Sequence, residues 1–64
     1  MPKKVTEANI EASAKATIVY EGGITEAIKS FENARTLAKQ ANDTAAIHTF
    51  NRLIRYCEDQ RATA

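Results

Sequence analysis

Two side chains in this sequence carry chemistry that enzymes often use, and each is the only one of its type. His48 is the single histidine and Cys57 is the single cysteine. A histidine needs a suitable neighbour to hold a metal ion or to act as a general base. On a helix, the residues three and four positions away offer no thiol and no carboxylate: Thr44, Ala45, Asn51 and Arg52. We therefore expect His48 to lie on the surface without a chemical role.

Cys57 fits a core position better than a reactive one. A nucleophilic cysteine requires a base or a positive charge nearby to hold it as the thiolate. Cys57 instead continues the helical spacing of Phe50, Leu53 and Ile54. A free thiol on such a face packs as a small apolar group. We expect Cys57 to be buried, with an intermolecular disulfide or a redox role as the alternative.

The other polar residues do not form a catalytic pattern. Acidic pairs occur at positions 7 and 11 and at positions 58 and 59, but no second cluster of ligands or bases accompanies either pair. The glycine pair Gly22-Gly23 lacks the flanking residues of a phosphate-binding loop. We expect a protein that is not an enzyme and that uses no cofactor and no metal ion.

Turn residues divide the chain into three segments. The only glycines are Gly22 and Gly23, and Asn42-Asp43 is the other turn-like pair. Between them, apolar residues recur at three- and four-residue steps, which is the spacing of one helix face. We predict one all-α domain over residues 1–64, a small three-helix bundle with antiparallel neighbours and frayed termini. Its helices are expected at about 6–21, 24–41 and 44–60.

The second and third segments have the clearest apolar faces. Gly23 or the competing Thr25 is the expected N-cap of the second helix, and Asp43 is that of the third. The second helix is expected to bury Ile24, Ala27, Ile28, Phe31, Ala34, Leu37, Ala38 and Ala41. The third is expected to bury Ala46, Ile47, Phe50, Leu53, Ile54 and Cys57.

The first segment differs because it carries two adjoining apolar faces. One consists of Ile10, Ala14 and Ile18, and the other of Ala8, Ala12, Ala16 and Val19. A three-helix monomer needs only one of them to close its core, so the second would face water. Residues 17–20 are also β-branched or aromatic, as in a strand. A strand this short would need a second chain to pair with, so we interpret the run as a helix end stopped by glycine.

Composition and charge exclude several classes of protein. Nine Lys and Arg against eight Asp and Glu leave a net charge of +1, unlike the strongly basic profile of a dedicated nucleic-acid-binding domain. No apolar run reaches the roughly 18 residues that span a membrane, and no apolar signal segment is present. A single cysteine cannot form an internal disulfide. We expect a cytoplasmic protein in a reducing compartment.

One spacing matches a known repeat motif, the order Gly-x4-Ala-x3-Phe-x2-Ala at Gly22, Ala27, Phe31 and Ala34. With the turn and helix that follow, residues 20–56 resemble a tetratricopeptide-type helical hairpin and the first helix of a next repeat. Tyr20 lies two residues before the glycine, where the family's aromatic lies four before, and no second copy follows. The resemblance implies antiparallel helices packed closely through Ala27 and Ala34, and a role in protein binding.

We expect the function to be the binding of another protein. Three amphipathic helices without site chemistry suit the presentation of a rigid face to a partner. The chain is then an adaptor, an inhibitor or an accessory subunit, and most simply a homodimer. Alanine-rich faces let helices approach closely, and an exposed tyrosine is typical of interface anchors. The predicted interface consists of Ala8, Ala12, Ala16, Val19 and Tyr20.

The alternative is a small nucleic-acid-binding regulatory protein. Its contacts would come from a basic strip between the second and third helices, with Tyr56 available for stacking. The strip consists of Arg35, Lys39, Arg52 and Arg55. A helix-turn-helix does not fit, because the glycine turn precedes the second helix and that helix, at about 17 residues, is too long. A ribbon-helix-helix dimer does not fit either, since residues 2–10 show no alternating strand pattern.

Overall fold

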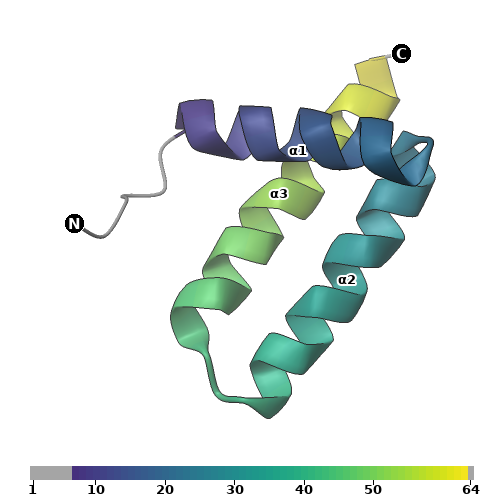
Figure 1. Cartoon of the computed structure of the whole chain (residues 1–64). Helices are drawn as coiled ribbons and strands as arrows, with labels where there is room; N and C mark the ends of the chain where they lie inside the picture. The colour runs from purple at the N-terminus through teal and green to yellow at the C-terminus, as the bar shows by residue number, and fades with distance from the viewer. Residues whose placement is uncertain (1–6, 64) are drawn as a thin grey trace.

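The computed structural model describes residues 7–63 and folds them into three helices. Helix α1 spans Glu7–Glu21, α2 spans Ile24–Gln40 and α3 spans Thr44–Thr63. Helices α2 and α3 form an antiparallel hairpin, and α1 lies across one end of it in contact with both (Figure 1). The prediction of a small all-α three-helix bundle is confirmed. Residues 17–20 are the last full turn of α1, and no strand occurs in residues 7–63.

The helix ends differ from the predicted ones by a few residues. Helix α2 ends at Gln40, and Ala41 is its C-cap. Helix α3 continues to Thr63, three residues beyond the predicted end at about residue 60. The Thr63 hydroxyl donates a hydrogen bond to the carbonyl of Asp59 at 3.2 Å, and Arg61 places a positive charge in the last turn. A positive charge near the C-terminus of a helix is favourable. The predicted start at residue 6 lies outside the described residues.

Gly22 makes the turn between α1 and α2. Its φ of +85° is in the left-handed region, which glycine enters without steric cost. The Gly22 N–H donates to the carbonyl of Val19 at 3.3 Å, and the Gly23 N–H donates to that of Ile18 at 3.0 Å. These bonds form a Schellman motif and satisfy carbonyls that the end of α1 leaves open. Gly23, rather than Thr25, is then the N-cap of α2.

The second turn repeats this geometry with asparagine in place of glycine. Asn42 has a φ of 56°, its N–H donates to the carbonyl of Lys39, and the N–H of Asp43 donates to that of Ala38. Asp43 then accepts a hydrogen bond on Oδ1 from the N–H of Ala46 at 3.1 Å, which confirms it as the N-cap of α3. One short turn therefore ends α2, reverses the chain and starts α3.

The core lies where the three helices cross. It consists of Ile10, Ala14, Ala27, Ile28, Phe31, Leu53, Ile54 and Cys57. One small side chain from each helix has no exposed surface, and these are Ala14, Ala27 and Cys57. Small side chains at a crossing allow the helix axes to approach closely. Below the crossing the hairpin is held by Phe31 and Phe50, whose ring centroids lie 6.4 Å apart.

Leu37 and Ala41 do not join this core. Both were predicted to be buried, but Ala41 is exposed and Leu37 keeps 66% of its surface in contact with solvent. The reason is the position of α1, which covers the opposite end of the hairpin (Figure 1). The apolar face of α2 is therefore broader than the surface that α3 alone can bury.

The left-handed position at the second turn gives a first prediction. Asn42→Gly should leave the free energy of unfolding unchanged or raise it slightly, whereas Asn42→Ala should lower it by about 1 kcal/mol. Glycine has no Cβ to strain this conformation, and alanine has one without asparagine's local hydrogen bonds. Urea unfolding followed by circular dichroism measures the difference. Equal stability of the two variants would contradict it.

The crossing gives a second prediction. Ala14→Leu should lower the free energy of unfolding by about 1–3 kcal/mol, because the extra methyl groups have no space between α1 and the hairpin. Ala12→Leu is the matched control, since Ala12 lies on the same helix and is exposed. It should change stability by less than about 0.5 kcal/mol. Similar losses for both variants would show that the crossing is not closely packed.

Candidate protein interface

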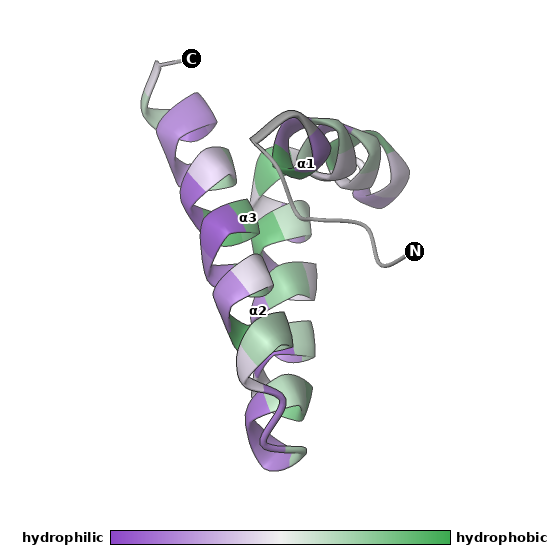
Figure 2. Cartoon of the chain, turned by 90° about the vertical axis from the view of Figure 1, so that its left-hand side faces the viewer, coloured by the Kyte–Doolittle hydropathy of each residue, from purple (hydrophilic) through white to green (hydrophobic). Residues whose placement is uncertain are grey.

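Helix α1 is apolar on two opposite sides. Toward the hairpin, Ile10 and Ala14 are buried, and Ile18 packs against the edge of the core. On the other side, Val19 keeps 81% and Tyr20 keeps 88% of its surface exposed. In Figure 2 one side of α1 faces the hairpin, and its other side meets solvent. Together with the exposed Ala12 and Ala16, Val19 and Tyr20 form what we call the outer face of α1.

Helix geometry accounts for this arrangement. Successive residues turn by about 100°, so a four-residue step returns to nearly the same side. Ala12 and Ala16 thus share a side roughly opposite to Ile10 and Ala14, and α1 buries only the second pair. Ala8 was also predicted to belong to the interface. It is part of α1, but its side chain is not among those that the structure describes. All the other predicted interface residues are exposed.

Two charged residues border the outer face. Lys15 Nζ lies 3.1 Å from a carboxylate oxygen of Glu11, one helical turn before it. The hydrogen bond and the charge of Glu11 raise the pKa of Lys15 above its ordinary value, and Tyr56 adds to the shift. Lys15 is therefore cationic at neutral pH. Both side chains are more than half exposed and remain accessible to a partner.

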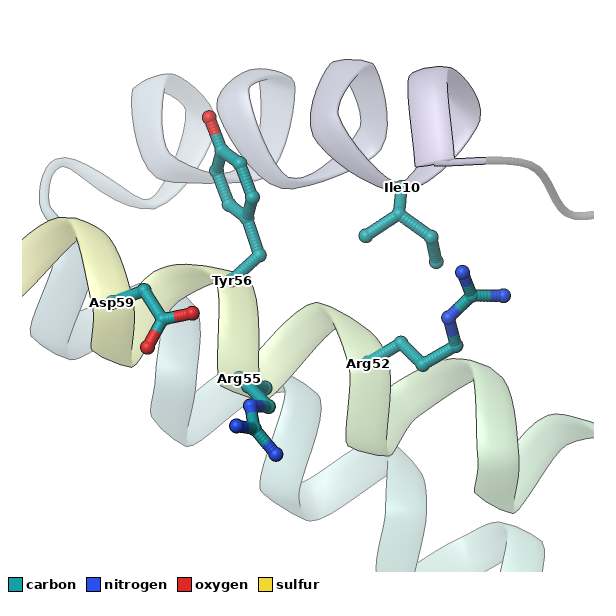
Figure 3. Close-up of a pocket in the computed structure, with 5 residues that line it drawn as sticks. All are labelled: Ile10, Arg52, Arg55, Tyr56 and Asp59. Carbon is teal, nitrogen blue, oxygen red and sulfur yellow. The ribbon is translucent and has the colours of Figure 1, made fainter.

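A shallow hollow of about 270 Å³ lies between α1 and the second half of α3 (Figure 3). Its lining consists of Ile10, Arg52, Arg55, Tyr56 and Asp59. Tyr56 and Arg52 extend toward α1, whereas Arg55 points away from it (Figure 3). The two arginines were predicted as nucleic-acid contacts and Asp59 only as one of an acidic pair, although residues three and four apart on α3 share a side. The carboxylate prevents the hollow from being a purely cationic site.

The four basic residues of the alternative interface come from two helices, Arg35 and Lys39 from α2 and Arg52 and Arg55 from α3. Arg35 reaches across the hairpin and donates a hydrogen bond to Oδ1 of Asn51 on α3 at 2.8 Å. Lys39 is exposed one turn further along α2. Arg52 extends toward α1, away from Arg55 (Figure 3). Nucleic-acid binding through these residues stays a prediction.

The two residues with enzyme-like chemistry are placed as predicted. His48 is exposed, and Cys57 is completely buried. Burial, with a smaller effect of the Glu58 charge, raises the pKa of the Cys57 thiol. Across residues 7–63, no three His, Cys, Asp or Glu side chains are grouped so that they could hold a metal ion. No helix in this same part of the chain is both long and apolar enough to cross a membrane.

Comparisons with known proteins found no relative, since no family model, curated protein or solved structure matches this chain. Of the residues that resemble the tetratricopeptide motif, Gly22 lies in the turn before α2, and Ala27, Phe31 and Ala34 lie on α2. Ala27 is completely buried and Ala34 is partly buried. The family resemblance itself stays a prediction.

The buried thiol predicts a pH dependence of stability. Because the pKa of Cys57 is raised in the folded protein, the unfolded chain loses this proton first as the pH rises. The folded state then binds more protons, so the free energy of unfolding should fall above the ordinary thiol pKa of 9.0. Urea unfolding between about pH 8 and 10 measures the slope, and Cys57→Ala should make it shallower. Equal slopes in the two proteins would contradict the prediction.

Proposed function

We propose that this chain is a small non-catalytic protein-interaction module that binds its partner through the outer face of α1. One observation carries the proposal: Val19 and Tyr20 are 81% and 88% exposed on a helix whose opposite side is already buried. Large apolar side chains that are exposed next to each other often mark a surface that a partner covers. A partner that covered this face would remove both side chains from water, at a gain of about 25 cal/mol per Å² of apolar surface.

The construction of α1 supports the same role. Its inner side is fixed by the core, so the outer face is presented on a rigid helix and loses little conformational freedom on binding. Tyr20 offers a large side chain with a polar tip, the type most often found at energetic centres of interfaces. Ala12 and Ala16 beside it leave room for another backbone to approach.

The role of an adaptor, an inhibitor or an accessory subunit is consistent with such a face, and so is self-association. We propose that the protein is cytoplasmic. The reducing environment there suits a chain whose single cysteine is buried and forms no disulfide. The tetratricopeptide-like spacing on α2 supports a protein-binding role, because that family binds proteins.

Site-specific photocrosslinking tests the proposed face. A benzophenone amino acid at position 16 should give covalent protein adducts in the native host, because this position lies in the outer face of α1. The matched control carries the same group at position 32, where Glu32 is exposed on α2 and outside the face. Adducts from position 16 and none from position 32 are the expected result. Equal labelling from both positions, or none from position 16, would contradict the proposal.

A further inference from the structure

The two charged residues beside the outer face, Glu11 and Lys15, follow each other in an order that favours one kind of partner. Glu11 precedes Lys15 along one edge of α1, with side chains that are 52% and 64% exposed. On the other edge, Ser13 and Thr17 carry no charge. The outer face is thus bordered by charge on one side only, with the acidic group nearer the helix N-terminus and the basic group nearer its C-terminus.

This edge is complementary to a copy of itself. If two α1 helices meet in an antiparallel orientation through their outer faces, their charged edges fall on the same side of the pair. Glu11 of each copy then lies level with Lys15 of the other. In a parallel two-fold pair, the charged edge of each copy would face the uncharged edge of the other, and these ion pairs would not form. The favourable arrangement is therefore the antiparallel one, which a two-fold axis perpendicular to the two helices generates.

We propose that the partner on the outer face of α1 is a second copy of this chain, packed antiparallel about a two-fold axis. The inference rests on the proposed function and names its partner. The axis passes at the level of Ser13, midway between Glu11 and Lys15. Ala12 then lies next to the axis, where a methyl side chain allows the backbones to approach. Val19 lies level with Glu7, the first residue of the other α1, and Tyr20 lies one residue beyond that end.

The size of the contact sets its strength. Helix α1 has 15 residues and is about 22 Å long. One helix pair of this length buries less than the roughly 1,200 Å² at which stable interfaces begin. The dimer is accordingly weak and depends on concentration. Sedimentation equilibrium should give a mass that rises from that of the 7.0 kDa monomer toward twice this value as the concentration approaches about 500 μM.

Variants at Ala12 test the axis. Ala12→Glu places two negative charges next to each other at the axis and should raise the dimer dissociation constant at least about tenfold. Ala45→Glu is the matched control, because Ala45 is an exposed alanine on α3, remote from α1, and should leave the constant unchanged. Circular dichroism should show both variants folded. A wild type that stays monomeric at about 500 μM, or equal effects of the two variants, would overturn the proposal.

Charge reversal tests the antiparallel register. Glu11→Lys and Lys15→Glu should each weaken self-association about tenfold, because like charges then meet across the axis. An equimolar mixture of the two variants should restore dimerisation, since every contact between the two different chains again joins unlike charges. Single variants that dimerise as tightly as the wild type would overturn the register. Photocrosslinks from position 16 to a different protein, with a monomeric wild type, would refute self-association and leave the proposed function intact.

Discussion

The contact of three helices at a crossing that buries one small side chain from each determines how this molecule is built. Ala14, Ala27 and Cys57 come from different helices, and none has exposed surface. Their small volume lets α1 rest directly on the hairpin, so a chain with few large apolar residues can still form a packed core. A larger side chain at any of these positions would lift α1 from the hairpin. The burial of the thiol and the seating of Phe31 and Leu53 depend on the same contact.

The helices could be predicted from sequence because their signals are local. Turn residues and caps at Gly22 and Asp43 fix the helix ends within a few residues, and the apolar spacing identifies the buried side of each helix. The angle at which α1 crosses the hairpin is not a local property. This angle decides which end of α2 is covered. Leu37 was expected in the core from its helical spacing, but it lies toward the uncovered end and is exposed. The extension of α3 to Thr63 was missed because its last turn carries no large apolar residue that would signal burial.

The candidate interface was predictable for a related reason. A helix with apolar residues on two sides can bury only one side in a three-helix monomer, so the sequence already indicated an excess face on α1. Which side would be buried depended on Ile10 and Ile18, whose bulk fills the space over the hairpin better than alanine does. The hollow beside Tyr56 was not predictable, because it arises where Ile10 of α1 meets a part of α3 that is distant in sequence.

The partial cover that α1 gives the hairpin divides the molecule into two parts of unequal rigidity. Near the crossing, backbone amides are shielded by three helices, whereas toward Asn42 they are shielded by two, and Ala34 and Ala46 there are only partly buried. Local opening needs less free energy where fewer buried contacts are lost. The end of the hairpin at the Asn42 turn should therefore unfold locally and transiently, while the three helices stay packed where they cross. Such fluctuations would leave the outer face of α1 in place, so the surface that we assign to binding sits on the part of the fold that is last to open.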